Sequence, residues 1–257
     1  MEIKVLGAHN LESATTKMVS ILVDDVLALD SGGLASSLSL PQMEKVTSLL
    51  ITHCHFDHVK DLANLALHRA FNSTTLNLYA TPDTIRSIST HILNGTTYPK
   101  FNEIPTPERP AIRYHPLEPF QAMVIDGYTV LAVPAKHPTT AVSYQVTSKE
   151  GKSFLYSGDT GPGCVAGWVG ISPQVLLMDT TFPDSFTDFA IQMGHMTPGL
   201  LKKELGEFSR LKKYLPEIVL IHLMPQYEGQ IREEVAQVAR ELEARIVLAY
   251  EGMQICL

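Results

Sequence analysis

Four side chains that commonly bind metals lie close together in "HCHFDH", which begins at residue 53 and directly follows the apolar run "VTSLLIT". On an extended segment, residues two apart point to the same face, so His53 and His55 can reach one ion. Asp57 and His58 follow as the chain turns into a helix, where they are predicted to face a second, adjacent ion. A metal site at a strand end is therefore the first expectation.

An alternative is that these residues are polar groups at a helix start, with Asp57 as the cap and the histidines incidental. Four ligand-type side chains at this spacing favour the metal site instead. Cys54 alternates to the opposite face of the extended segment, so it is predicted to be a buried packing residue rather than a ligand.

Three further polar residues close or interrupt apolar runs. His137 ends "VLAVPAKH", Asp159 ends "FLYSGD", and His222 lies within "EIVLIHLM". A buried imidazole or carboxylate is costly without a partner. Each alone could be a satisfied core group, but together with the first cluster they are candidate ligands. The remaining histidines considered are predicted to be structural or on the surface, with His91 and His115 flanking a segment that could contact a substrate: His9, His68, His91 and His115.

The composition excludes several classes of protein. Hydrophobic residues make up 45% and charged residues 18% of the 257 residues, which is ordinary for a globular chain. No apolar run approaches the roughly 20 residues of a membrane span, and the first residues lack a signal-peptide pattern, so we expect no membrane partner. Three scattered cysteines are compatible with the cytoplasm, which is the expected location. The net charge of -7 disfavours a long nucleic acid as partner but allows a small anionic substrate held by a metal.

Hydrophobic periodicity indicates strands mixed with helices, without a regular alternation. Strands are expected at 2–9, 18–32, 48–52, 75–80, 128–137, 141–148, 153–159, 175–182, 217–224 and 245–257, and helices at 39–48, 57–71, 81–93, 197–211 and 228–244. Thr81 with Pro82, and Thr197 with Pro198, are typical of helix starts. This pattern suggests two sheets packed together with helices outside.

Residues 94–120 contain six prolines and little periodicity. They are predicted to form a long surface excursion, because long loops of compact domains are often lids or binding loops.

The chain resembles the metallo-β-lactamase fold hydrolases, whose HxHxDH signature "HCHFDH" fits. His137, "SGDT" at 157–160 and "IHLMPQY" at 221–227 resemble the later motifs, in the same order. Within that superfamily the chain is similar to the ribonuclease Z branch, and more closely to the class II 3′,5′-cyclic-nucleotide phosphodiesterases. The second resemblance rests on "HILNGTTYPKF", "KHPTTAVSYQV" and "MDTTFPDS…GHMTPGLL".

The resemblance spans essentially the whole chain and implies one α+β domain over 1–257. Its architecture would be a four-layer αββα sandwich with the site at one edge, between the sheets. A homodimer is implied as well. The cofactors would be two divalent metal ions per chain, which are Zn²⁺ in the leading interpretation, although Mn²⁺ or Fe also fits such sites.

The resemblance also implies roles for particular residues. His53, His55 and His137 would hold one metal, Asp57, His58 and His222 the other, and Asp159 would bridge both. His195 would lie beside the scissile phosphate, with Asp179 orienting it. This chain departs from the family in having Asp179 where Glu is frequent, a shorter reach, and Tyr98 where the phosphodiesterases frequently have Trp.

The chemistry expected of such a site is hydrolysis of a small phosphodiester, above all a 3′,5′-cyclic nucleotide. Two metals about 3.5–4 Å apart lower the pKa of a bridging water and neutralise charge on the phosphate, so a metal-bridging hydroxide can attack. Asp57 could also serve as a base for this water. His195 could donate a proton to the leaving oxygen.

With the resemblance, the excursion at 94–120 is predicted to roof the active site, and Tyr98 and Phe101 are candidates to stack on a base. The alternative is that the two rings pack the loop onto the body of the protein.

Other functions share the expected site. A tRNA 3′-processing endonuclease of the ribonuclease Z kind would need an arm that grips tRNA, and no Gly- and Lys/Arg-rich insertion lies between 157 and 194. Hydrolysis of a thioester or lactam is possible on the same fold, although "GHMTP" favours a phosphodiester. A non-catalytic binding module is disfavoured by the complete ligand set.

Overall fold

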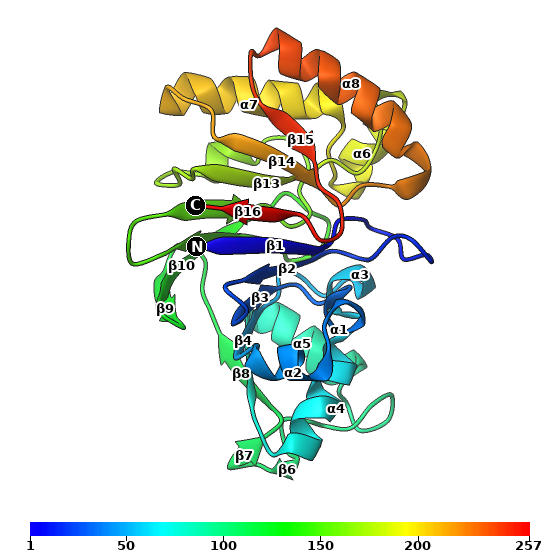
Figure 1. Cartoon of the computed structure of the whole chain (residues 1–257), viewed down its shortest axis with the longest axis vertical. Coiled ribbons are helices and arrows are strands. Elements are labelled where there is room, and N and C mark those ends of the chain that lie inside the picture. Colours follow the sequence, from blue (N-terminus) through cyan, green and yellow to red (C-terminus); the bar gives the residue numbers. More distant parts are fainter.

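A computed structural model describes all residues from 1 to 257 as two seven-stranded sheets with helices on their outer faces (Figure 1). The first sheet has the order β16-β1-β2-β3-β4-β5-β8, and its strands are β16 (Gln254–Cys256), β1 (Glu2–Gly7), β2 (Ser20–Val23), β3 (Leu27–Leu29), β4 (Ser48–Leu50), β5 (Leu76–Ala80) and β8 (Ile112–Pro116). The second has the order β15-β14-β13-β12-β11-β10-β9, and its strands are β15 (Ile246–Leu248), β14 (Glu217–Ile221), β13 (Val175–Asp179), β12 (Ser153–Tyr156), β11 (Val142–Thr147), β10 (Tyr128–Pro134) and β9 (Ala122–Ile125).

The helices form two groups along the chain. Those of the N-terminal half are α1 (Leu34–Ser37), α2 (Leu40–Lys45), α3 (Phe56–Val59), α4 (Leu62–Asn72) and α5 (Pro82–His91). Those of the C-terminal half are α6 (Thr187–Met193), α7 (Pro198–Lys212) and α8 (Glu228–Glu241), with the short 3-10 helices η1 (Val165–Gly167), η2 (Asp184–Phe186) and η3 (Pro225–Tyr227). None of the helices combines the length and apolar character needed to cross a membrane.

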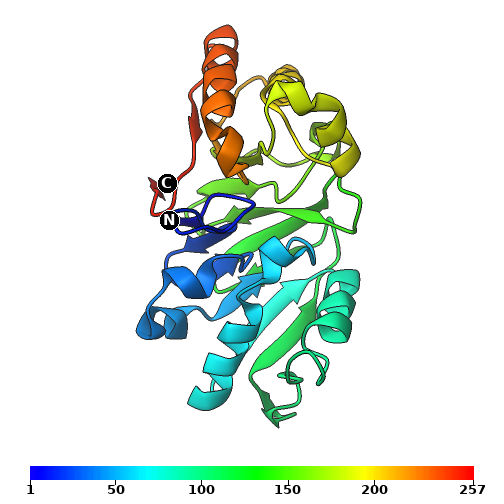
Figure 2. The same ribbon diagram turned by 90° about the vertical axis from the view of Figure 1, so that its right-hand side faces the viewer.

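Strand alternation explains how one sheet supports two hydrophobic layers. In β13, Val175 and Leu177 belong to the core between the two sheets, whereas Leu176 and Met178 belong to the core beneath α7 and α8. A third core lies between the first sheet and the N-terminal helices. Because successive side chains of a strand point to opposite faces, these runs are apolar throughout. The expected α+β, four-layer αββα sandwich is confirmed (Figures 1 and 2).

The helix starts predicted from Thr-Pro pairs are present. The Thr81 hydroxyl accepts a hydrogen bond from the amide of Thr84 at 3.3 Å, and that of Thr197 accepts from the amide of Leu200 at 3.4 Å. Each satisfies an amide that the first helical turn leaves without a partner. The cap at Thr197, two residues after His195, defines the start of α7.

The predicted terminal strand at 245–257 is two strands instead. β15 pairs with β14 in the second sheet, and β16 pairs with β1 in the first. The break falls where Gly252 takes a φ of +88°, in the left-handed region that favours glycine. The end of the chain therefore contributes an edge strand to each sheet.

Residues 94–120 do not cover the candidate metal ligands with their tip. The segment ends in a small hairpin, β6 (Pro105–Thr106) and β7 (Arg109–Pro110), before entering β8. In Figures 1 and 2 this hairpin lies at the lower end of the molecule, whereas α3, which follows His55, lies near the middle. The hairpin at the tip of the predicted excursion therefore lies away from α3.

Phe101 is a core residue, so the prediction that it stacks on a base is wrong. Its side chain is 1% exposed and belongs to the core between the first sheet and the N-terminal helices. Tyr98 packs against the same core, with its ring centroid 5.6 Å from that of Phe101. The alternative, in which the rings pack the loop onto the body, describes this segment.

We predict that Phe101→Ala lowers the free energy of unfolding by about 3–5 kcal/mol, because it removes a fully buried ring and leaves a cavity. Phe71→Ala is the matched control: Phe71 is 83% exposed, so its removal should change stability by less than about 0.5 kcal/mol. Urea unfolding measures both. A stable Phe101→Ala variant with a changed substrate affinity would contradict the core placement.

Candidate active site

The candidate site lies where the carboxyl ends of strands from both sheets meet. β3 is parallel to β4 in the first sheet, and β12, β13 and β14 are parallel in the second. β10 points the same way as β12, because both are antiparallel to β11. These strands deliver a polar residue each to one edge: Asp30 after β3, His53 after β4, His137 after β10, Asp159 after β12, Asp179 at the end of β13 and His222 after β14.

The first candidate ligand group contains His53, His55, His137 and Asp159, whose ligand atoms all lie within 4.8 Å of one another. Nε2 of His137 and Nδ1 of His55 face each other at 3.2 Å. Nε2 of His53 lies 3.5 Å from Oδ2 of Asp159. Three imidazoles and one carboxylate oxygen therefore converge on a point, as the sequence predicted for His53 and His55.

The second candidate ligand group contains Asp57, His58, His222 and again Asp159. Oδ1 of Asp159 lies 3.1 Å from Nε2 of His58 and 3.3 Å from Nε2 of His222. Oδ2 of Asp57 lies 2.9 Å from Nε2 of His222. One oxygen of Asp159 thus faces each ligand group, which is the position of a bridging carboxylate.

Three buried atoms in the two groups make no hydrogen bond of normal geometry, although the last two are 3.1 Å apart: Nε2 of His53, Nε2 of His58 and Oδ1 of Asp159. Buried polar atoms are nearly always paired, because leaving one unpaired costs about 1–3 kcal/mol. Burial, reinforced by the neighbouring His58, also holds the pKa of His53 well below its usual range, so this imidazole is neutral. A neutral imidazole is the form that binds a metal, and these orphaned atoms fit bound cations.

In the histidines that direct Nε2 toward the other ligands, the second ring nitrogen, Nδ1, has a polar partner. Nδ1 of His53 lies 3.0 Å from the Thr52 hydroxyl, and Nδ1 of His137 lies 3.2 Å from the carbonyl oxygen of Gly194. Nδ1 of His58 donates to Asp30 at 2.7 Å. Such bonds place the proton on Nδ1, so that Nε2 presents its lone pair to an ion.

Asp30 is a site residue that the motif analysis missed. Its carboxylate is fully buried and accepts hydrogen bonds from His58, from the amide and hydroxyl of Thr52 at 2.8 and 2.9 Å, and from the Tyr156 hydroxyl at 2.7 Å. The Thr52 hydroxyl in turn meets His53. The signal was present in "VLALDSG", since Asp30 closes an apolar run as Asp159 does.

His195 lies beside both ligand groups and is held by Asp179. Its Nδ1 donates to Oδ2 of Asp179 at 2.8 Å, and its ring centroid is 5.3 Å from that of His137 and 5.2 Å from that of His222. Burial disfavours the imidazolium, but the charge and hydrogen bond of Asp179 outweigh it and raise the pKa of His195 to about 9. The shorter side chain of Asp179, compared with Glu, therefore does not prevent the pairing.

Thr181 joins this pair to the second ligand group and was also missed. Its hydroxyl donates to Oδ1 of Asp179 at 2.7 Å and lies 2.7 Å from Nδ1 of His222. The carboxylate of Asp179 thus serves two imidazoles, one directly and one through a hydroxyl. "MDTTF" pointed to Asp179 but carried no signal for the hydroxyl two residues later.

The backbone at the site is confined by close contacts. Gly194 has a φ of +73°, and a Cβ at that position would lie 2.9 Å from Nδ1 of His137, so only glycine fits before His195. His222 itself has a φ of +65°, a conformation that non-glycine residues seldom adopt. Its hydrogen bond with Thr181 accompanies this strained geometry.

Two other predicted residues are not brought to the ligands. His91 is exposed at the end of α5. The opposite end of that helix is the one near the site, because Asp83 accepts a hydrogen bond from Thr140, three residues after His137. With a rise of about 1.5 Å per residue, His91 lies about 12 Å further along the helix than Asp83. No hydrogen bond, ion pair or ring contact joins Tyr98 to a candidate ligand either.

The cysteines are not ligands in either group. Cys54 is half-buried, less than its predicted burial. Cys164 is buried, and its thiol lies 3.5 Å from Oε2 of Glu204 on α7. The Glu204 carboxylate also accepts from the amides of Gly163 and Val165 at 2.7 and 3.1 Å. Glu204 therefore fastens the loop that follows Asp159 to α7.

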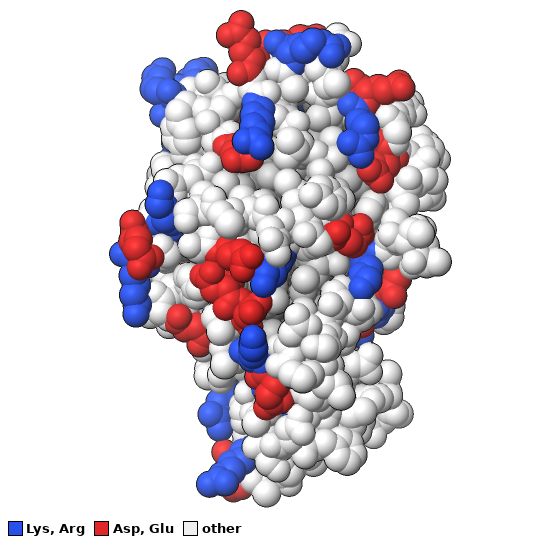
Figure 3. Space-filling view, in the orientation of Figure 1, with Lys and Arg blue, Asp and Glu red and all other residues white.

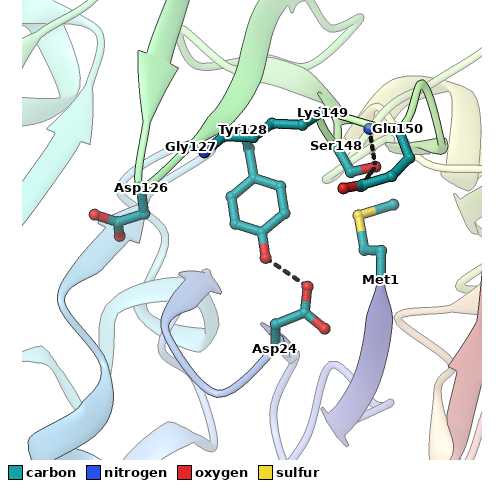
Figure 4. A pocket seen from close by; sticks show the side chains of 8 residues that line it. All are labelled: Met1, Asp24, Asp126, Gly127, Tyr128, Ser148, Lys149 and Glu150. Carbon is teal, nitrogen blue, oxygen red and sulfur yellow. Dashed lines mark hydrogen bonds between the residues drawn. The ribbon is translucent and has the colours of Figure 1, made fainter.

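A separate hollow of about 260 Å³ lies at the amino-terminal end of β1 (Figure 4). Its acidic side chains have partners within the chain: Asp24 accepts from the Tyr128 hydroxyl and Asp126 accepts from Thr47. It contains no histidine or cysteine, and its lining residues are Met1, Asp24, Asp126, Gly127, Tyr128, Ser148, Lys149 and Glu150. The hollow therefore offers no set of metal ligands comparable to the two candidate ligand groups.

Residues 20–223 match the Beta-lactamase superfamily domain, and the chain belongs to this family. The fold family consists of metal-dependent hydrolases. The fold implies a dinuclear metal centre, and the two ligand groups fit one. No curated protein matches the sequence significantly.

Solved structures extend the comparison at the level of the fold. Yeast PDE1 superimposes with a TM-score of 0.82 at 17% identity, covering 100% of this chain and 99% of that chain. YhfI from Bacillus subtilis gives 0.77 at 18% identity, with 99% and 98% covered. Human tRNase Z, short form, gives 0.69 at 19% identity, with 100% and 99% covered. These likenesses confirm the metallo-β-lactamase fold.

We predict that Asp159→Ala purifies with fewer than one metal per chain, because both ligand groups lose their shared carboxylate and retain buried, unpaired imidazoles. Elemental analysis of the purified protein measures the metal content. Asp126→Ala, at an exposed carboxylate of the separate hollow, should match the wild-type protein. Two metals per chain in Asp159→Ala would show that Asp159 is not the bridge.

Thr181→Val should weaken metal binding by about 10- to 100-fold, the usual effect of losing a group that orients a ligand. The substitution keeps the side-chain shape but removes the partner of Nδ1 of His222. Competition with a chromophoric chelator measures the affinity. Thr181→Ser retains the hydroxyl and should restore wild-type binding; equal affinities for valine and threonine would contradict the orienting role.

Proposed function

We propose that the protein is a dinuclear-metal phosphodiesterase that hydrolyses a small phosphodiester, and that its substrate is a 3′,5′-cyclic nucleotide. The observation that carries this proposal is the combination of two ligand groups sharing Asp159 with the His195–Asp179 pair directly beside them. Such an arrangement suits a reaction that needs an activated water, a stabilised anion and a protonated leaving group.

In this proposal each side chain of the two groups has a defined role. His53, His55 and His137 would hold one metal and Asp57, His58 and His222 the other, with Asp159 shared between the two groups. Five imidazoles among seven ligands favour Zn²⁺. When bound, the two cations supply an activated water and neutralise charge on the phosphate.

His195 acts as the proton donor to the leaving oxygen. Asp179 favours the protonated imidazole by raising its pKa, and it holds Nδ1 so that Nε2 is the donor atom. At 12% side-chain exposure, it is accessible to a substrate that enters from solvent. General acid catalysis of this kind contributes about 10²–10⁴-fold to the rate.

Two observations support a cyclic nucleotide over other phosphodiesters. The stretches "HILNGTTYPKF" and "GHMTPGLL" resemble segments of class II cyclic-nucleotide phosphodiesterases. Among the solved structures compared, the phosphodiesterase yeast PDE1 gives the TM-score of 0.82 over the full length of both chains. At 17% identity this likeness concerns the fold, and the metal-dependent hydrolase rests on the family match instead.

The tRNA endonuclease is the alternative with the same fold, as human tRNase Z illustrates. A tRNA-binding surface requires free Lys and Arg to neutralise phosphates. On α7, Lys202 pairs with Glu241 and Arg210 pairs with Glu207, which leaves Lys203 and Lys212 of this helix without an ion pair. The face in Figure 3 shows charges of both signs interspersed, without a continuous basic area. These features favour a small substrate.

The test is hydrolysis by protein loaded with Zn²⁺ or Mn²⁺. Cyclic AMP or cyclic GMP should be converted to a nucleoside monophosphate, and removal of metal by a chelator should abolish turnover. His195→Ala should lower kcat by about 10²–10⁴-fold without changing metal content. A precursor tRNA, a thioester and nitrocefin complete the panel. Protein with two metals per chain that hydrolyses none of the cyclic nucleotides would refute the proposal.

A further inference from the structure

The helix that precedes His195 exposes three large apolar side chains. In α6, Phe189 is 47%, Ile191 is 48% and Met193 is 41% exposed. Residues four apart lie on the same face of a helix, so Phe189 and Met193 are neighbours. Ala190 is the residue of the helix that is buried in the core. The helix therefore presents more apolar surface than its packing against the core buries.

Backbone hydrogen bonds and edge-on ring contacts connect this part of α6 to His195. The amide of His195 donates to the carbonyl of Ala190 at 2.8 Å, and that of Gly194 donates to Ile191 at 3.2 Å. The ring of Phe182 lies edge-on to His195 at 5.9 Å and to Phe189 at 5.4 Å between centroids. A single buried ring thus separates the proton donor from the exposed phenyl group.

Phe189 differs in this respect from the other exposed aromatic residue near the ligands. Phe56 is 66% exposed between His55 and Asp57, but no ring contact connects it with His195 or with another aromatic residue. Tyr98 and Phe101, the rings expected to hold a base, pack against a core on the far side of the first sheet. Of these rings, Phe189 is therefore the one that is both exposed and connected to His195, through the ring of Phe182.

We infer that Phe189, assisted by Met193, is the surface on which the base of the substrate stacks. The inference rests on the proposed function and names the feature of the substrate that the site recognises. With its phosphate at the ligand groups and its leaving oxygen at His195, a nucleotide extends past His195 toward α6. An aromatic ring and a polarizable thioether both pack favourably on the flat face of a base.

A stacking platform has a definite consequence for specificity. Stacking recognises the π-face of a base and not its hydrogen-bonding edge, so it tolerates different bases. A purine covers more of the platform than a pyrimidine does. Cyclic AMP and cyclic GMP should therefore have similar KM values, both lower than that of cyclic CMP.

The test compares ligands with and without a base on the metal-loaded protein. In the wild-type protein, adenosine 5′-monophosphate should bind more tightly than methyl phosphate. Phe189→Ala should weaken the nucleotide by about 5- to 150-fold, the range for loss of one stacking aromatic, and leave methyl phosphate unchanged. Phe189→Trp should retain tight binding. Titration calorimetry measures all of these without requiring turnover.

Phe71→Ala, which removes an exposed phenyl group from the end of α4, is the matched control and should bind both ligands as the wild type does. If the wild type hydrolyses cyclic nucleotides but Phe189→Ala leaves nucleotide binding and KM unaltered, the stacking role is wrong and the phosphodiesterase stands. If no cyclic nucleotide is hydrolysed but nucleotide binding depends on Phe189, the phosphodiesterase proposal fails and the platform stands.

Discussion

The active site depends above all on the carboxylate of Asp159, which lies between ligands from both sheets. It follows a strand of the second sheet, yet its oxygens face imidazoles that the first sheet delivers, His53 on one side and His58 on the other. An anion in such a buried place is stable only among opposite charges. The two sheets must therefore pack closely enough at this edge for one carboxylate to contact imidazoles from the first sheet and its own neighbours in the second.

Each sheet solves the same problem of orientation in the same way. In the first, Asp30 accepts a hydrogen bond from His58 directly and is linked to His53 through the hydroxyl of Thr52. In the second, Asp179 accepts a hydrogen bond from His195 directly and is linked to His222 through the hydroxyl of Thr181. A buried carboxylate and a threonine therefore fix two imidazoles in each half of the site. The second arrangement also links a metal ligand to the proton donor, so binding and proton transfer share one support.

The sequence was informative wherever a polar residue closed an apolar run, since burial then demands a partner. This logic located His137, Asp159 and His222, and the resemblance supplied His195 with Asp179. It was uninformative where a residue acts through a side-chain hydroxyl, as Thr181 does, because threonine is common in strands and loops alike. Aromatic residues were ambiguous for a different reason: Phe101 and Phe189 have the same chemistry, and only the packing tells a core ring from an exposed one.

The ends of the chain lie side by side, with the amino group of Met1 hydrogen-bonded to the carbonyl of Leu257 at 3.2 Å (Figure 1). β1 runs in the same direction as β3, because both are antiparallel to β2. Its first residue is therefore at the edge opposite the histidines. β16 is antiparallel to β1, so the last strand also finishes at that far edge, and every strand that supplies a candidate ligand comes from the interior of the sequence.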